Sequence, residues 1–225
     1  MNNEIILFTT IVLDLGFVTF MSHFKREGLI AAIVLNLILV STFGGMLVSF
    51  FSFVTNAGNV FYASIFLAIN LLVEKYGKKS ALGAVYASFI TLIVFIFMAQ
   101  LTIRFSAPLS SGFSQAVNFI FKLAPRIALA SMIAYITAAS FNIWLFEKLR
   151  QKSGEKLLWF RNGASQVFAQ AIDSVLFFSI AFMGILPFPL LIQTIIIGFV
   201  AKVIVALLST PFIYISHMNT EIETQ

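Results

Sequence analysis

Cysteine is absent from the 225-residue chain, and histidine occurs only at His23 and His217. The absence of cysteine excludes disulfides, thiolate metal sites and cysteine nucleophiles. Both histidines fall at the edges of predicted membrane segments, which excludes a haem or zinc ion held by a histidine cluster. No arrangement of serine with a base suggests nucleophilic catalysis. We therefore expect a protein that has no metal or cofactor and is not an enzyme.

Charged residues are also scarce, at 10% of the chain, while 60% of the residues are hydrophobic and the mean hydropathy is +1.01. Ordinary soluble domains contain about 25% charged residues. A soluble fold of this length could not cover so much apolar surface with a polar shell. The composition predicts an all-α, polytopic bundle of transmembrane helices. Because Glu4 rather than a basic segment precedes the first apolar run, we expect that run to be retained as a helix.

Seven apolar segments approach the length of about 20 residues that a spanning helix needs. They are 4–22, 29–50, 55–73, 81–101, 124–146, 163–186 and 188–210. The connections at 52–59 and 184–189 are short and uncharged, and the longest ones are 102–123 and 147–162. None of them could hold a soluble domain, so residues 1–225 are expected to form one membrane domain of six to seven spans.

Lysine and arginine alternate between the predicted loops, which indicates the orientation in the membrane. The loops after segments one, three and five hold ten basic residues, whereas the other side holds Arg104 and Lys122. The ten are Lys25, Arg26, Lys75, Lys78, Lys79, Lys148, Arg150, Lys152, Lys156 and Arg161. The pattern predicts an N-terminus outside and a C-terminus in the cytoplasm of a cell (inner) membrane protein. It also explains the net charge of +5 without a nucleic-acid partner.

A polar stripe runs along the sixth predicted helix. Asn162, Gln166, Gln170 and Asp173 recur at spacings of four, four and three, and Phe177 continues the line. At 100° per residue the four polar side chains fall within roughly 80° of one another. Such a row is unfavourable in lipid, so it should face other helices or a wet cavity. A substrate cavity and interhelical hydrogen bonding are both compatible with it.

Lys202 is the one charge in the seventh predicted helix. Its estimated depth differs by only about 6 Å from that of Asp173 on the preceding helix. The short turn between the two helices makes them antiparallel neighbours, which predicts a pair in the substrate site or a purely structural salt bridge. Asp14, near the middle of the first helix, has either Lys202 or a backbone donor as its expected partner.

The fifth predicted helix has two distinct faces. Ser131, Tyr135 and Asn142 share one face and are candidates for lining a cavity. A second face carries only small side chains, which is typical of close helix packing. The small residues are Ala130, Ala134 and Ala138.

Three groups of motifs follow one another in order along the helices. The first group is Gly58-Asn59-Val60-Phe61-Tyr62-Ala63-Ser64 with Asn70 and Glu74-Lys75-Tyr76-Gly77-Lys78-Lys79. The second is Arg126-Ile127-Ala128 with Ala130-Ser131 and Ala134-Tyr135. The third is Arg161-Asn162, Ser165, Gln170, Ile172-Asp173-Ser174, Phe177, Ala181-Phe182, Gly184, Lys202 and Thr210-Pro211. From Lys25 to Tyr214 the chain thereby resembles the queuosine precursor transporter family, also called the putative vitamin uptake transporter family.

The resemblance implies uptake of 7-deazaguanine bases across the lipid bilayer. Such a flat base needs amides and a carboxylate to hydrogen-bond its edge and aromatic rings to stack on its faces. Phe177, Tyr135 and Trp144 are the candidate rings. The candidate substrate-binding residues are Asn162, Gln166, Gln170, Asp173, Lys202, Phe177, Tyr135, Asn142, Asn70 and Glu74. The family usually has Asp where Asn70 and Asn142 stand, and Asn where Val73 stands. Fewer acids shift the expected substrate toward neutral bases.

Function classes other than a self-sufficient importer remain open. One is a substrate-binding subunit energised by separate ATPase partners, because the chain itself has no Walker motif. An intramembrane enzyme lacks the necessary side chains, and a channel or assembly factor has no positive signal. The sequence also leaves open whether copies of the chain form a homo-oligomer.

Overall fold

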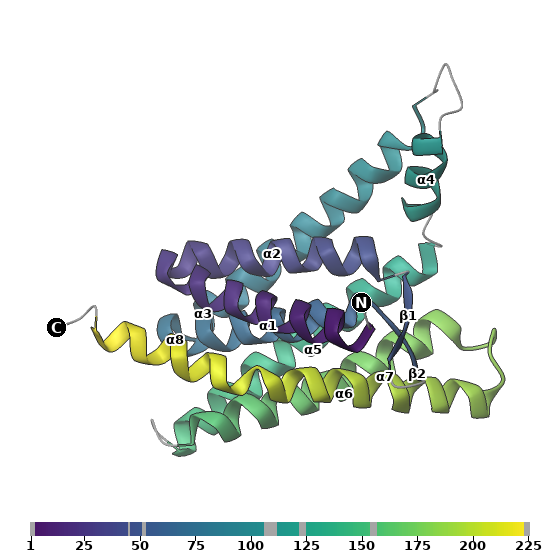
Figure 1. Cartoon of the computed structure of the whole chain (residues 1–225). Coiled ribbons are helices and arrows are strands. Elements are labelled where there is room, and N and C mark those ends of the chain that lie inside the picture. Colours follow the sequence, from purple (N-terminus) through teal and green to yellow (C-terminus); the bar gives the residue numbers. More distant parts are fainter. Residues whose placement is uncertain are drawn as a thin grey trace.

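The computed structural model describes residues 3–44, 46–50, 53–105, 112–121, 125–153 and 157–222, and these form a helical bundle with one short hairpin (Figure 1). The elements are α1 (Asn3–Met21), η1 (Ser22–Phe24), α2 (Lys25–Phe43), β1 (Leu47–Phe50), β2 (Phe53–Asn56), α3 (Asn59–Thr102), α4 (Gly112–Phe121), α5 (Pro125–Ser153), α6 (Leu158–Phe182), α7 (Phe188–Leu208) and α8 (Thr210–Ile222). The predicted all-α polytopic bundle is confirmed.

Five helical stretches are long and apolar enough to cross a membrane, and two of them contain a break. In the stretch 3–43, η1 and Lys25, with φ 58°, separate α1 from α2. Within α3, Gly77 has φ 78° and ψ 168°, a conformation that side-chain-bearing residues rarely adopt. These two breaks divide the five stretches into seven helical segments, and Ser209 further separates α7 from α8 within the stretch 188–216. The number of segments that cross the bilayer stays a prediction.

The predicted segment 29–50 is wrong at its C-terminal end. Helix α2 stops at Phe43, and residues 47–50 form β1, which pairs antiparallel with β2 from Leu47↔Asn56 to Phe50↔Phe53. Glycine at position 44 and the β-branched and aromatic residues that follow favour a strand over a helix. The connection expected at 52–59 therefore contains β2.

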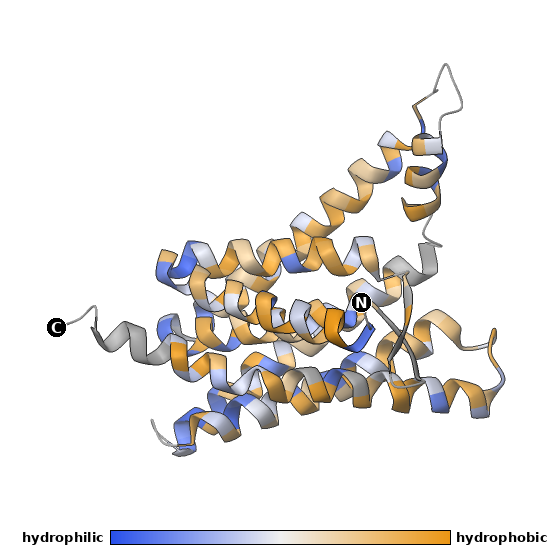
Figure 2. Cartoon of the chain, viewed as in Figure 1, coloured by the Kyte–Doolittle hydropathy of each residue, from blue (hydrophilic) through white to orange (hydrophobic). Residues whose placement is uncertain are grey.

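Two helices were not predicted. Helix α4 lies within the expected connection 102–123, and α8 follows α7 beyond the expected end at residue 210. Neither is long enough to span a bilayer alone, since α4 has 10 residues and α8 has 13. The large side chains of Phe113 and Phe119 are exposed on α4, and Figure 2 shows its mixture of apolar and polar residues.

The N-terminal limb of α3, residues 59–76, is the centre of the bundle. Every residue from 59 to 73 except Phe61 is buried, because α1, α2, α5, α6 and α7 all contact this helix. A helix surrounded on all sides can carry polar side chains on opposite faces without exposing either face to lipid. This limb therefore separates two polar regions, one toward α5, α6 and α7 and one toward α1 and α2.

Candidate functional site: a buried polar column

The polar stripe of α6 is fully enclosed by protein. Asn162, Gln166, Gln170 and Asp173 each have 0% of their surface exposed. Helix α6 packs against α5 and α7, and its polar side chains also reach α3. We call this line of side chains, together with its partners on α3, α5 and α7, the polar column.

The lower layer of the column is a chain of amides from three helices. Asn142 Nδ2 donates to Asn70 Oδ1 at 2.6 Å, and Asn70 Nδ2 donates to Asn162 Oδ1 at 2.9 Å. Gln166 Nε2 also donates to Asn162 Oδ1, at 2.9 Å, and to Oγ of Ser209, which follows α7, at 3.0 Å. Because an amide both donates and accepts, these side chains satisfy much of one another's hydrogen-bonding capacity.

The upper layer is an ion pair between adjacent helices. Lys202 Nζ of α7 donates to Asp173 Oδ2 of α6, and both residues are buried. The hydroxyl of Tyr62 on α3 donates to the other carboxylate oxygen at 3.2 Å, and Lys202 Nζ lies 4.5 Å from the centre of the Tyr62 ring. The pairing predicted from depth and the short α6–α7 turn is therefore present. It also shows that Asp14 is not the partner of Lys202.

Gln170 lies between these two layers and is the exception in the column. Neither Nε2 nor Oε1 of its side chain has a hydrogen-bond partner among the described residues. Gln166 Oε1, one turn away, and Ser174 Oγ also have no hydrogen-bond partner among the described residues. Leaving a buried polar group unsatisfied costs about 1–3 kcal/mol. The middle of the column thus holds donors and acceptors that are ready for a polar ligand.

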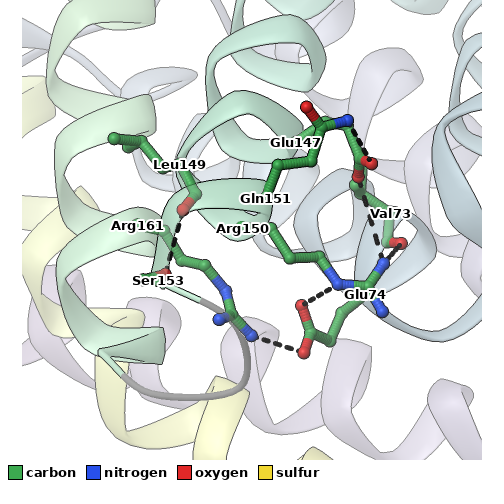
Figure 3. A network of polar contacts seen from close by, with 8 residues as sticks. All are labelled: Val73, Glu74, Glu147, Leu149, Arg150, Gln151, Ser153 and Arg161. Carbon is green, nitrogen blue, oxygen red and sulfur yellow. Dashed lines mark hydrogen bonds and ion pairs between the residues drawn. The ribbon is translucent and has the colours of Figure 1, made fainter.

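Glu74 lies outside the polar column. Its carboxylate pairs with the buried guanidinium of Arg161 and lies 3.7 Å from Arg150 Nε (Figure 3). Arg150 Nη1 also donates to the backbone oxygen of Val73 at 3.2 Å. The geometry indicates that this network joins α3, just before its break at Gly77, to the end of α5 and the start of α6. A direct substrate contact for Glu74 finds no support here.

The predicted aromatic residues occupy different surroundings. Tyr135 is buried, and its hydroxyl lies 2.8 Å from Ser88 Oγ. Phe177 packs its ring 5.0 Å from that of Phe178. Trp144 is 44% exposed and lies under Lys148, so it stands apart from the column. A stacking role for Trp144 therefore has no structural basis.

Two column residues were missed by sequence reasoning. Tyr62 and Phe66 of α3 are buried, with stacked rings 6.3 Å apart, and Tyr62 contacts the ion pair. A signal was present, because residues 62, 66, 70 and 74 recur every four positions and so share one helix face. Arg161 was also assigned to a loop, whereas only 1% of its surface is exposed.

An apolar cavity of about 310 Å³ lies elsewhere, between α1, the hairpin and the start of α3. Leu7, Met46 and Phe61 are among its lining residues. Its lining contains no residue of the polar column. Amide and carboxylate chemistry is therefore concentrated in the column rather than in this cavity.

A comparison with protein-family models matches residues 56–216 to the family described as "Putative vitamin uptake transporter". The chain belongs to this family. The match covers α3 to α8 and therefore every residue of the polar column. The family resemblance deduced from the motifs is confirmed, and the chain is a membrane transporter rather than an enzyme.

Named relatives in three bacteria support the assignment. A protein of Bacillus subtilis (strain 168) named "Probable queuosine precursor transporter" is 34% identical over 220 residues, which cover 95% of this chain and 93% of the relative. The "Queuosine precursor transporter" of Escherichia coli (strain K12) is 30% identical over 135 residues, or 60% of this chain and 58% of the relative. A Haemophilus influenzae protein is 30% identical over 133 residues, 59% of this chain and 54% of the relative. No solved structure matches the chain significantly.

Proposed function

We propose that this chain imports queuosine precursors, the 7-deazaguanine bases, into the cytoplasm. The names of the relatives supply the class of compound, and the resemblance extends over almost the whole Bacillus subtilis protein. The polar column is the proposed binding site. Its side chains come from four helices, so movement of one helix relative to the others would change the site.

The unpaired carboxamide of Gln170 is the observation that carries the proposal. It offers an adjacent donor and acceptor in the middle of a buried column, with Gln166 Oε1 and Ser174 Oγ also unpaired nearby. The lactam edge of a 7-deazaguanine base presents the complementary acceptor and donor. Two hydrogen bonds to such an edge would satisfy Gln170, while aromatic rings such as Tyr62, Phe66 and Phe177 would supply stacking faces.

The charge balance of the column favours neutral bases. Asp173 is already paired with Lys202, and Asn70 and Asn142 are neutral where the family usually has acids. The column therefore has no net negative charge to attract a cationic aminomethyl base. We expect the chain to prefer neutral precursors over the aminomethyl form.

The basic loops support the proposed orientation. The α1–α2 turn, the break in α3, the end of α5 and the start of α6 lie at the end of the bundle that carries α8 (Figure 1). The sequence at these places holds most of the lysine and arginine, which mark the cytoplasmic side. A reporter fused after Gln225 should therefore read cytoplasmic, and a cysteine at Asn2 should be labelled from outside.

The alternative of an ATPase-driven binding subunit has less support. Such a subunit needs a face for its partner, and the face of α5 that carries only small side chains, here called the small-residue seam, is one that a partner helix could contact. Ala130, Ala134 and Ala138 each have 0% exposure, and Ala138 clusters with Ala169 of α6. The seam is therefore occupied by packing within the chain, which favours a self-sufficient transporter.

The decisive experiment uses a strain that cannot make queuosine or take up its precursors. Expression of this chain, with each precursor supplied at low concentration, should restore queuosine in tRNA. Gln170→Leu should lose the rescue, whereas Gln193→Leu, the same change at an exposed position of α7, should keep it. Absence of rescue by every precursor, with the protein present in the membrane, would overturn the proposal.

A further inference from the structure

A second buried polar group lies on the other side of α3. Asp14 of α1, Asn36 of α2 and Ser64 of α3 are 8%, 0% and 0% exposed. The carboxylate of Asp14 faces the hydroxyl of Ser64 and the carboxamide of Asn36. We call these three residues the Asp14 cluster. The three helices that carry them pack against one another, so the cluster is held by the bundle itself.

Oxygen atoms dominate the Asp14 cluster. Asn36 Nδ2 donates to the backbone oxygen of Ala32 at 3.1 Å, which fixes the amide and leaves its Oδ1 without a partner. Asp14 Oδ2 and Ser64 Oγ also have no hydrogen-bond partner among the described residues. Three helices thus bring together a carboxylate, a carbonyl oxygen and a hydroxyl oxygen. Oxygen atoms of this kind are ligands of hard cations, and the single carboxylate charge of the cluster matches a monovalent one.

The cationic side chains of the surrounding helices are engaged or placed elsewhere. Lys202 of α7 pairs with Asp173, and Lys75 of α3 donates to Ser216 of α8 at 3.0 Å. Lys25 and Arg26 are exposed at the start of α2, about 15–17 Å along that helix from Asn36. In the described part of the chain, no ion pair neutralises Asp14. An isolated carboxylate in the membrane interior is strongly unfavourable and is a functional candidate by default.

The Asp14 cluster and the polar column lie at the same level of the bundle. Ser64 follows Tyr62 by two residues, which places it about 200° around α3 and only about 3 Å along its axis. Tyr62 contacts Asp173, whereas Ser64 faces Asp14. One turn of α3 therefore touches both groups. A displacement of this turn on occupation of one group would be transmitted to the other.

We propose that Asp14, Asn36 and Ser64 bind the small monovalent cation, Na⁺ or a proton, that is coupled to transport. Either cation would neutralise the Asp14 carboxylate, and Na⁺ would in addition be coordinated by the two neutral oxygens. Asp14 and Asn36 fall outside the matched region 56–216, so the family match does not account for them. Cation binding is independent of the proposed substrate, while its coupling to uptake rests on the proposed function.

The Na⁺ arm of the test measures binding without substrate. The melting temperature of the purified protein is followed as NaCl replaces choline chloride at constant ionic strength. A Na⁺ site predicts a rise of several degrees that saturates, that is absent in Asp14→Asn and that needs roughly tenfold more Na⁺ in Ser64→Ala. Glu27→Gln, which changes an exposed acid on α2, is the matched control and should behave like the parent protein.

The proton arm uses proteoliposomes and a 7-deazaguanine base. If Na⁺ neither stabilises the protein nor drives uptake, an acid-outside pH gradient should accumulate the base, and Asp14→Asn should abolish the dependence on that gradient. The proposal is overturned if Na⁺ does not stabilise the protein and neither cation drives accumulation, or if Asp14→Asn responds to both like the parent protein. A Na⁺-dependent melting shift without uptake of any base would preserve the cation site and refute only the proposed substrate.

Discussion

The two faces of α3 differ in how their polar groups are satisfied. Toward α5, α6 and α7, Asn70 both accepts and donates, so it joins Asn142 to Asn162 in a chain of amides, while Asn142 Oδ1 and Gln166 Oε1 have no partner among the described residues. Toward α1 and α2, Ser64 and Asn36 face the Asp14 carboxylate, and Asp14 Oδ2, Asn36 Oδ1 and Ser64 Oγ have no partner among the described residues. The same helix therefore carries one face stabilised by mutual hydrogen bonds and one that lacks a positive charge. Removing a charge or an amide that has a partner should therefore cost more stability than removing one that has none.

Neutralising one acid on each face gives the largest expected difference. Asp173→Asn leaves Lys202 buried without its partner, which should destabilise the fold by about 3–5 kcal/mol and abolish uptake. Asp14→Asn strands no cation and should leave the melting temperature in Na⁺-free buffer unchanged or higher. Thermal unfolding of the detergent-solubilised variants measures this contrast. Equal losses of stability would mean that Asp14 has a cationic partner after all.

The double variant Asp173→Asn with Lys202→Met separates charge pairing from function. Removing both charges should restore most of the folding stability, because no buried ion is left unpaired. Uptake should remain absent if the pair belongs to the substrate site. Full transport by the double variant would show that the pair is only structural.

The amide chain should be sensitive at its centre. Asn70→Leu removes the group that joins Asn142 to Asn162 and leaves both amides short of a partner. We expect a loss of about 1–3 kcal/mol in unfolding free energy. Asn118→Leu, on the exposed surface of α4, is the control and should change stability little. An unchanged melting temperature for Asn70→Leu would contradict the hydrogen-bond chain.

Gln170→Leu should separate stability from transport within the column. The side chain makes no hydrogen bond in the described structure, so its replacement should leave the melting temperature unchanged or raise it. Uptake should fall to background, because the proposed ligand contact is lost. Measuring both in the same preparation tests the point, and a large loss of stability would assign Gln170 to the scaffold.

Trp144→Leu is expected to have the smallest effect. The ring is 44% exposed and lies away from the column, so the change should alter stability by no more than about 0.5 kcal/mol. Uptake kinetics should match those of the parent protein. A marked rise in the substrate concentration for half-maximal uptake would restore the stacking role that the sequence suggested for this residue.

Periodicity along single helices could be predicted from the sequence, because it depends only on local geometry. The stripe from Asn162 to Asp173 follows from the 100° step, and the pairing with Lys202 follows from a short turn and matching depth. The family motifs supplied the class of compound. That these residues hold a substrate stays a prediction.

Contacts between helices distant in the sequence could not be predicted. The meeting of Asp14 with Asn36 and Ser64 depends on how α1, α2 and α3 pack, and no local pattern specifies that packing. The burial of Arg161 also depends on Glu74, 87 residues earlier. The short elements β1, β2, α4 and α8 were also not predicted. They are too short to give the long apolar runs from which the membrane spans were predicted.

The buried stripe on α6 has a consequence for biogenesis. A helix that carries Asn162, Gln166, Gln170 and Asp173 would partition poorly into lipid from the translocon by itself. Helix α7 is almost entirely apolar and follows after a turn of only a few residues. The two helices should therefore enter the bilayer together as a hairpin, with Lys202 meeting Asp173 during insertion. Lengthening the turn should lower the yield of inserted protein before any defect in transport can be measured.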